Sequence, residues 1–261
     1  MSDALSIEQQ LRPYADKLLG MLDPTIIRRV AIDRPERAIV EGFLALPDLT
    51  SMVADILDGF GIDTAIPSSV LAPLAPGQRI VGPAITARQS RARQQAGFAL
   101  ANRHKPKGGG IDQITLTHAG DVFVVDAGGA IDASSFGGIL ATAAIAHRLA
   151  GVVADGAVRD RASIRSAGLA VWSRSVTPRT GKHRLELVEF NGVVEIGGVQ
   201  VRPGDLILGD DDGLIVVPPE IVADVLEQAQ QAAARESVLL SALGTGSSAK
   251  EAAAILAPSK W

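Results

Sequence analysis

A regular alternation of apolar runs and small-residue helical segments in the middle of the chain restricts the fold more than any other feature. Residues 121–126 (DVFVVD) and 151–156 (GVVADG) have the pattern of buried strands, and residues 137–150 (GGILATAAIAHRLA) between them have a helical pattern. A second helical segment over about 161–167 and a strand over 169–174 continue the alternation. Strands connected by helices over short links are typical of parallel sheets. The sequence therefore predicts an α/β fold.

Strand patterns of a second kind lie on both sides of this segment. Residues 79–88 (RIVGPAITAR) have a strand pattern with a Gly-Pro bend. Short apolar runs over 185–190, 193–201 and 205–218 are broken by Asn-Gly, Gly-Gly and Asp-Gly pairs. These pairs accept positive φ angles and favour tight hairpins. We expect hairpins here, followed by a long amphipathic helix over about 219–242.

The first fifty residues have a helical pattern of their own. Leucines recur at roughly helical spacing over 5–22, and Pro24 is the expected stop. Thr50 or Ser51 is expected to cap a further helix that runs through Asp58, where glycines end it. These helices would precede the strands of the α/β fold.

The chain is therefore expected to have three parts. These are an N-terminal helical extension over 1–48, one α/β domain over 49–245 and a C-terminal tail over 246–261. Within the domain, residues 102–113 (NRHKPKGGGIDQ) are the most loop-like stretch. They are expected to form a surface excursion or a mobile lid, and the surface excursion is favoured.

The composition limits the class of function. The 261 residues carry 25 Lys and Arg against 29 Asp and Glu, and this mild acidity gives no general attraction for nucleic acid. The absence of cysteine excludes disulfides, thiolate metal sites and a cysteine nucleophile. No apolar run approaches the roughly 18 residues of a membrane helix, and the N-terminus lacks the pattern of a signal peptide. We expect a soluble, cytoplasmic protein without nucleic-acid or membrane partners.

The most suggestive polar residues follow the predicted strand over 151–156. Asp155, Arg159 and Asp160 lie within six residues, and ligands collect at the carboxyl ends of strands in α/β sheets. A guanidinium grips a carboxylate bidentately, and a carboxylate holds a hard divalent cation. A structural ion pair is the alternative, and we favour the functional interpretation.

A second candidate is the segment from Ser134 to Leu140, which opens the predicted helix. Unpaired N–H groups and the positive end of the helix dipole would hold a carboxylate there. Simple capping with close helix–sheet packing is the alternative, and it is favoured for this segment taken alone.

Other patterns are weaker. The glycine turn over 126–132 does not have the spacing of a dinucleotide turn, and the acids over 209–213 indicate a hairpin rather than a calcium loop. No two histidines have metal-ligand spacing. The arginines over 88–93 lack aromatic neighbours for base stacking, so a solvated or subunit-contacting face is favoured there.

Gly138 is followed after twenty residues by Arg159-Asp160. This spacing resembles the signature of the class II pyruvate aldolases that cleave 4-hydroxy-4-methyl-2-oxoglutarate and 4-carboxy-4-hydroxy-2-oxoadipate. The regulator of ribonuclease activity A proteins share this fold and signature. The resemblance runs from about Leu49 to Ser237, and it includes the stretches 49–59, 81–87, 120–129 and 198–218.

The resemblance implies an α-β-β-α sandwich of the regulator-of-ribonuclease-activity-A type, assembled as trimers or hexamers with the site between subunits. It implies that Arg159 binds the oxo-acid oxygens and that Asp160 holds Mg²⁺ or Mn²⁺. Glu236 of a neighbouring subunit is the candidate for completing the outer shell of the metal. The backbone N–H groups that would hold the pyruvyl end of the substrate are those of Gly137, Gly138, Ile139 and Leu140.

Two positions depart from this family pattern. The aldolase signature has an acid three residues after Asp160, where this chain has Ser163. Many relatives have an acid where Gly138 stands. The loss of two acids near the metal bears on metal affinity or substrate choice.

A class I aldolase needs a buried lysine to form a Schiff base, and the lysines of this chain lie in polar loops or tails. We therefore expect a divalent-metal-dependent aldolase that cleaves a 4-hydroxy-2-oxo acid to pyruvate and a second carbonyl compound, with bound water as the base. Oxaloacetate decarboxylation is expected as well, because it uses the same enolate. The lysines are Lys17, Lys105, Lys107, Lys182, Lys250 and Lys260.

Two other classes of function are alternatives to the aldolase. Some relatives bind a ribonuclease or a helicase without catalysis, and the missing acids at positions 138 and 163 favour this alternative. The presence of Arg159 and Asp160 favours the enzyme, because a regulator needs no oxo-acid site. A methyltransferase is disfavoured, because the chain lacks a cofactor turn.

Overall fold

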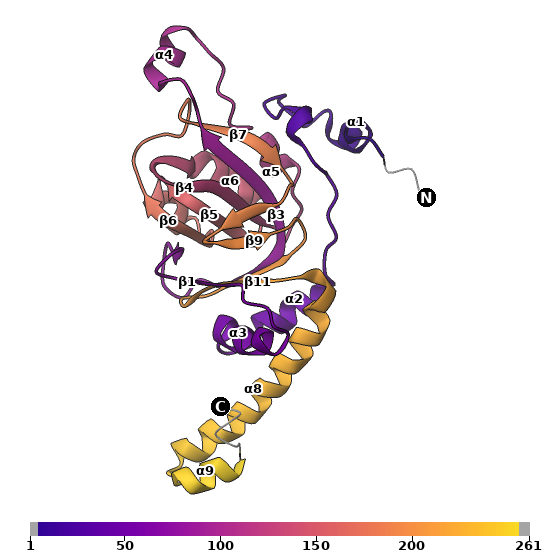
Figure 1. Cartoon of the computed structure of the whole chain (residues 1–261), viewed down its shortest axis with the longest axis vertical. Helices are drawn as coiled ribbons and strands as arrows, with labels where there is room; N and C mark the ends of the chain where they lie inside the picture. The colour runs from indigo at the N-terminus through magenta and orange to yellow at the C-terminus, as the bar shows by residue number, and fades with distance from the viewer. Residues whose placement is uncertain (1–4, 256–261) are drawn as a thin grey trace.

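The computed structural model describes residues 5–255 (Figure 1), and nine of its strands form one sheet. A separate hairpin is made by β8 (Val194–Ile196) and β9 (Val199–Val201). The strands of the main sheet, in spatial order, are β1 (Ala65–Pro67), β11 (Gly213–Val217), β10 (Leu206–Gly209), β3 (Ile80–Arg91), β4 (Val122–Phe136), β5 (Gly151–Val158), β6 (Val171–Val176) and β2 (Ala72–Pro73), and β7 (Leu185–Phe190) pairs with β3.

The helices of the described residues surround this sheet. None of them is both long enough and apolar enough to cross a membrane. They are α1 (Ile7–Leu11), α2 (Arg37–Leu44), α3 (Leu49–Gly59), α4 (Ala96–Ala101), α5 (Asp112–Thr115), α6 (Gly138–Ala146), α7 (Arg161–Ser166), α8 (Val222–Gly244) and α9 (Ala249–Ile255), with single 3-10 turns η1 (Arg12–Tyr14), η2 (Pro24–Ile26) and η3 (Pro219–Ile221).

The parallel core predicted from the sequence is confirmed. Strands β3, β4, β5 and β6 pair in parallel in that order, and α6 and α7 connect the last three. Two of the predicted hairpins are confirmed, because β10 pairs antiparallel with β11 and β8 with β9. The hairpin expected at the Asn-Gly pair is wrong, because β7 pairs with β3 instead of β8. The sheet therefore combines a parallel half with an antiparallel half, and β3 belongs to both.

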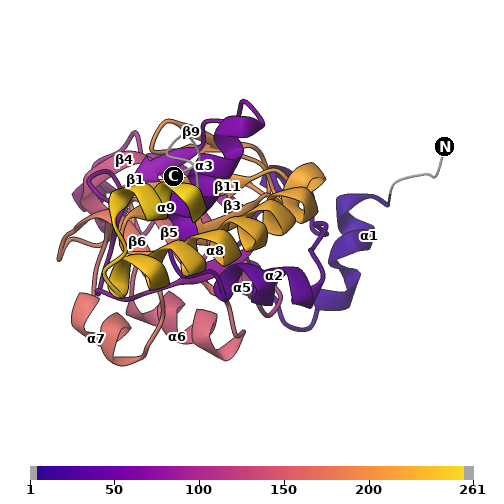
Figure 2. The same ribbon diagram turned by 90° about the horizontal axis from the view of Figure 1, so that it is seen from below.

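Alternating side chains divide the apolar residues into three layers. On β4, Phe123 and Val125 pack with the cluster that includes residues of α5, α6 and α7. Val122 and Val124 face the opposite way, into a cluster shared with β10 and β11. The outer side of β10 and β11 packs against α2, α3 and α8. Helices, the parallel half of the sheet, its antiparallel half and a second set of helices thus follow one another, which is the expected α-β-β-α sandwich. Figure 2 shows α6 and α7 together along one side of it.

The N-terminal segment is less helical than predicted. Only α1 and η1 are helical over the stretch 5–22, and Pro24 begins a 3-10 turn instead of ending a helix. The reason is a tertiary contact, because the buried carboxylate of Asp112 accepts the backbone N–H groups of Leu19, Met21 and Leu22. A helix would need the same N–H groups for its own carbonyls.

Two further expectations differ from the structure. The strand predicted over 121–126 does not end at the glycine pair but continues as β4 to Phe136, with Gly128 and Gly129 at positive φ where its register with β5 shifts. In the C-terminal tail, residues 249–255 form α9, which packs against α8. Residues 256–261 lie outside the described residues.

Helix α3 is confirmed over Leu49–Gly59, but its expected cap is wrong. Neither Thr50 nor Ser51 caps it, because both lie inside the first turn and the residue before the helix is Asp48. The carboxylate of Asp210 supplies the cap, since it accepts the Thr50 N–H at 2.9 Å and the Thr50 hydroxyl at 2.6 Å. The acidic run over 209–213 is thus a hairpin turn that stabilises a helix.

Replacing Asp210 with Ala is expected to lower the free energy of unfolding by about 1 kcal/mol, because the first turn of α3 loses its acceptor. Urea denaturation followed by circular dichroism measures the change. The matched control is Asp55→Ala in the same helix, where the side chain is exposed. A loss no larger than that of the control would contradict the capping role.

Candidate functional site

The candidate site is built where β4 and β5 end side by side. Phe136 pairs with Val158 at the last position of both strands, and the Arg159 N–H donates to the Phe136 carbonyl at 3.0 Å. Asp160 then adopts a left-handed conformation, with φ 62° and ψ 34°. Its carbonyl accepts the Ile164 N–H and so starts α7. Such a conformation is uncommon for residues other than glycine and clusters at functional sites.

This turn directs Arg159 and Asp160 toward the start of α6. The Asp160 Oδ2 atom accepts the Gly138 N–H at 2.8 Å and lies 3.5 Å from the Arg159 Nε atom. Both side chains remain partly accessible, at 37% for Arg159 and 44% for Asp160. A Cβ atom on Gly137 would lie 2.9 Å from the Arg159 Cγ atom, so glycine leaves the room that the arginine occupies. The structure thus brings these four predicted residues together.

A pocket of about 410 Å³ opens beside this pair. Of the predicted site residues, Gly137, Ile139, Leu140 and Arg159 line it. Asp160 lies beside Arg159, and Gly138 donates its N–H to Asp160. None of the described residues that line it is an Asp, Glu or His. The remaining lining residues are Met21, Gln89, Pro106, Gly108, Gly110, Ile111, Ser134, Ser135, Phe136, Thr180, Gly181, Lys182 and Leu185.

One wall of the pocket comes from residues that sequence reasoning did not assign to a site. Met21 belongs to the N-terminal segment, Gln89 to β3 and Lys182 to the loop before β7. The loop-like pattern over 102–113 is the one sequence signal for this wall, because Pro106, Gly108, Gly110 and Ile111 of that stretch line the pocket. The stretch is therefore more than a surface excursion.

Two buried side chains hold this wall in place. Asp112 is 1% exposed, and it binds the N-terminal segment through three backbone N–H groups at 2.6 to 3.1 Å. The Gln113 amide donates to the carbonyls of Gly108 and Gly110 at 2.7 and 3.3 Å. Met21 packs so closely on Gly110 that a Cβ atom there would lie 2.6 Å from the Met21 Sδ atom.

Replacing Asp112 with Ala is expected to lower the free energy of unfolding by roughly 1 to 3 kcal/mol, because three N–H groups lose their acceptor. The N-terminal segment should also be cut faster by trypsin after Lys17. Denaturation and limited proteolysis measure both effects, with the exposed Asp16→Ala as the control. Cleavage as slow as in the parent protein would argue against the anchoring role.

Asp155, the first acid of the candidate motif, does not face the pocket. Its side chain is buried, forms an ion pair with Arg174 and accepts the Gly197 N–H at 2.8 Å. The hydrogen bond that Arg174 donates to Asp155 holds the pKa of Arg174 above its ordinary value. Asp155 therefore stabilises the contact between β5, β6 and the β8–β9 hairpin.

The acids of the glycine turn are also occupied elsewhere. Asp126 accepts the Gly128 N–H at 2.9 Å, which closes a local turn. Asp132 pairs with Arg91 at 2.5 Å, and this hydrogen bond holds the pKa of Asp132 below its usual range. Arg88 pairs with Glu189. Two of the arginines considered for anion binding are thus neutralised by carboxylates.

A divalent cation would find one carboxylate of this chain at the site. Within residues 5–255, no donor reaches the Asp160 Oδ1 atom, and no three His, Cys, Asp or Glu side chains gather as a metal cluster. Mg²⁺ is commonly held by one or two carboxylates, with waters and substrate oxygens completing its shell. Asp160 suits such an ion.

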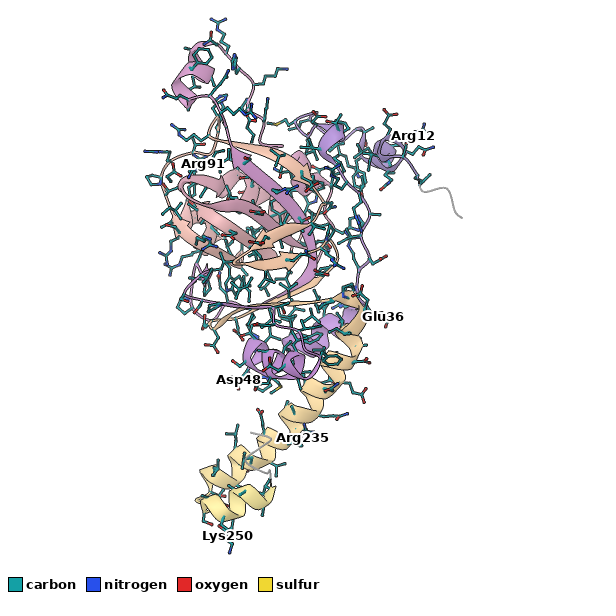
Figure 3. All side chains as sticks on the ribbon, viewed as in Figure 1. Arg12, Glu36, Asp48, Arg91, Arg235 and Lys250 are labelled. Carbon is teal, nitrogen blue, oxygen red and sulfur yellow. The ribbon has the colours of Figure 1, made fainter. Side chains whose placement is uncertain are left out.

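Glu236 lies away from Asp160 within one chain. It is on α8, which packs against α2, α3 and α9. Its neighbour Arg235 lies on the part of α8 that projects from the sheets (Figure 3). A role for Glu236 in the metal shell of a neighbouring subunit stays a prediction.

The fold and the Arg–Asp pair at the strand ends define a class of α-β-β-α sandwich proteins. The family model described as RraA-like, Aldolase/RraA, matches residues 50–216. The chain belongs to the RraA-like family. The match begins within α3, so Met21 lies before it.

Two curated relatives illustrate the similarity. Protein DlpA of Legionella pneumophila is 32% identical over 200 residues, which are 77% of this chain but only 31% of DlpA. A protein of Halalkalibacterium halodurans, provisionally named a 4-hydroxy-4-methyl-2-oxoglutarate aldolase, is 29% identical over 200 residues. The match covers 77% of this chain and 86% of that protein.

Solved structures share the fold. An uncharacterized protein of Pseudomonas syringae pv. tomato superposes with a TM-score of 0.72 at 27% identity, over 85% of this chain and 99% of that one. Streptomyces coelicolor RraAS2, described as an unusual member of the RNase ES inhibitor RraA family, superposes with a TM-score of 0.67 at 26% identity. That match covers 80% of this chain and 98% of RraAS2.

Proposed function

We propose that this protein is a divalent-metal-dependent aldolase that cleaves a 4-hydroxy-2-oxo acid to pyruvate and a second carbonyl compound, and that it also decarboxylates oxaloacetate. The observation that carries the proposal is the Arg159 side chain, which lines a pocket at the start of α6 with Asp160 beside it. The aldolase name of the Halalkalibacterium relative supports the reaction class.

The start of α6 offers further donors to an oxo acid. Within the described residues, the N–H groups of Ile139 and Leu140 donate to no protein acceptor, and both residues line the pocket. Such N–H groups, together with the helix dipole, favour a bound carboxylate. Arg159 adds a positive charge where negative charge develops in an enolate.

Asp160 would hold Mg²⁺ or Mn²⁺ next to these donors. When bound, the cation supplies Lewis-acid polarisation of the 2-oxo group. The Gly138 N–H fixes the Asp160 Oδ2 atom, which leaves the Oδ1 atom for the ion. Asp160 is thereby oriented before any ligand arrives.

Cleavage breaks the bond between C3 and C4 of the substrate. Its electron pair passes to C3 as the enolate, while C4 becomes the carbonyl carbon of the second product. The C4 hydroxyl proton goes to water, because the described lining residues include no Asp, Glu or His. C3 then takes a proton from solvent and becomes the methyl group of pyruvate.

The test couples pyruvate release to lactate dehydrogenase and NADH. The substrates are 4-hydroxy-4-methyl-2-oxoglutarate and oxaloacetate, each with Mg²⁺ or Mn²⁺ and with EDTA. A parallel measurement follows deuterium exchange into the methyl group of pyruvate by NMR, which reports the enolate alone. Metal-dependent turnover and exchange are expected. Absence of exchange and of turnover in folded protein would overturn the proposal.

A non-catalytic regulator of a ribonuclease or helicase is the second candidate. Gly138 and Ser163 favour it, because they stand where related aldolases carry acids, and RraAS2 is described within an inhibitor family. Binding to a ribonuclease without pyruvate exchange would favour this candidate. We also propose a trimer or hexamer, which light scattering would detect as three or six times the mass of the chain.

A further inference from the structure

The pocket offers little charge beyond Arg159. Among the described residues that line it, the other charged side chain is Lys182, which lies exposed in the loop before β7. Arg159 is already committed to the oxo-acid end of the substrate in the proposed function. Among the described lining residues, Lys182 would therefore be the one cation left to pair with a second carboxylate on the substrate.

Several side chains that line the pocket are apolar. Met21, Ile111, Leu140 and Leu185 line the pocket, and Ile139 stands at its edge. Ile139 is 70% exposed and Met21 is 44% exposed. Binding is favoured when a ligand covers apolar side chains and removes them from water. This surface therefore suits an alkyl group better than an ion.

The apolar surface is fixed by the fold. Asp112 anchors the segment that carries Met21, and Gln113 anchors the loop before Ile111. Its position is therefore set before a ligand binds. A preformed apolar wall selects ligands by shape and polarity.

Gln89 is one of the uncharged polar residues that line the pocket, together with Ser134, Ser135 and Thr180. Gln89 follows a bulge in the pairing of β3 with β7, and bulges re-aim side chains. Its Oε1 atom is buried, and it finds no hydrogen-bond partner within the described residues. An amide can donate to a hydroxyl and also accept from it. Gln89 is therefore suited to bind the hydroxyl group of a substrate.

We infer that the site selects monocarboxylic 4-hydroxy-2-oxo acids whose C4 carries an aliphatic group. Their hydroxyl binds Gln89, and their aliphatic group packs against Met21 and Ile111. The inference rests on the proposed function, and it narrows the preferred substrate of the aldol cleavage, as distinct from oxaloacetate decarboxylation, to a class without a second carboxylate.

The test compares two substrates that differ at one carbon. 4-Hydroxy-2-oxohexanoate ends in a methyl group, and 4-hydroxy-2-oxoadipate ends in a carboxylate. We expect kcat/KM to be at least about tenfold higher for the hexanoate. Met21→Gln should reduce this preference through KM, whereas Met21→Leu should retain it. Lys182→Met should not reduce the preference for the hexanoate over the adipate.

Gln89 has a readout of its own, because oxaloacetate has no C4 hydroxyl. Gln89→Leu should lower hexanoate cleavage more than oxaloacetate decarboxylation, so that the ratio of the two activities falls about tenfold. An equal fall in both would overturn the role of Gln89. Circular dichroism establishes that each variant is folded.

Deuterium exchange into pyruvate separates the two proposals, because pyruvate has no C4 group. Suppose that pyruvate exchanges deuterium, that the adipate is cleaved as well as the hexanoate or better, and that Lys182→Met loses the cleavage of the adipate. This result would overturn the proposed substrate class and leave the aldolase activity established. Absence of exchange would overturn the aldolase and this inference with it. Exchange with preference for the hexanoate supports both.

Discussion

Replacing Arg159 with Ala is expected to lower metal-dependent pyruvate release by about 10²- to 10³-fold. The guanidinium lines the pocket beside the free N–H groups of α6, so it is the fixed positive charge closest to the expected enolate. Because the side chain is 37% exposed and its one ion-pair partner in residues 5–255 is Asp160, removing it should change the free energy of unfolding little. The coupled assay and thermal denaturation measure the two effects.

The matched control is Arg165→Ala. Arg165 lies on α7, a few residues further along the chain, with an exposed side chain. The Arg165→Ala substitution removes the same charge from the same region and changes no residue that lines the pocket. If Arg165→Ala and Arg159→Ala lose activity to the same degree, net charge would explain the loss and Arg159 would have no specific role.

Replacing Asp160 with Asn is expected to abolish metal-dependent turnover and leave the protein folded. The amide oxygen of Asn can still accept the Gly138 N–H, and Asn tolerates the left-handed backbone. An amide has no negative charge to hold a divalent cation, so Mn²⁺ binding should weaken strongly. Calorimetric titration with Mn²⁺ and the coupled assay give independent readouts.

Two further variants separate the role of Asp160 in metal binding from its role in capping α6. Asp160→Ala removes both the acceptor and the tolerance for positive φ, and it should cost about 1 to 2 kcal/mol of stability in addition. Asp126→Asn makes the same chemical change at an acid that accepts a backbone N–H outside the pocket lining. Unchanged Mn²⁺ affinity in Asp160→Asn would restrict Asp160 to capping α6.

The proximity of the Arg159–Asp160 pair to α6 could be predicted because it depends only on the order of neighbouring strands and helices along the chain. The two residues end a strand, and the preceding helix starts at the end of the neighbouring parallel strand, so their proximity follows from topology. The parallel pairing of β4, β5 and β6 followed in the same way from the alternation of strand and helix patterns, whereas the α-β-β-α sandwich was implied by the family resemblance.

The wall of the pocket could not be predicted because it depends on contacts between distant segments. Met21 reaches the pocket only because Asp112, 91 residues further along, takes its N–H. The same contact removed the helix expected over 5–22. Gln89 lines the pocket just after a register shift between β3 and β7, and no pattern in the sequence predicts that shift.

The contact made by Asp112 also divides the site into two separable units. The residues that handle the acid end lie just after β5 and at the start of α6. Met21 and residues 106–111 lie on two other segments, which the Asp112 carboxylate holds together. Substrate preference can therefore diverge between members of this fold through changes in the segments that carry Met21 and residues 106–111, while the residues that bind the acid end stay the same. An exchange of both segments, rather than either alone, should transplant a preference from one member to another.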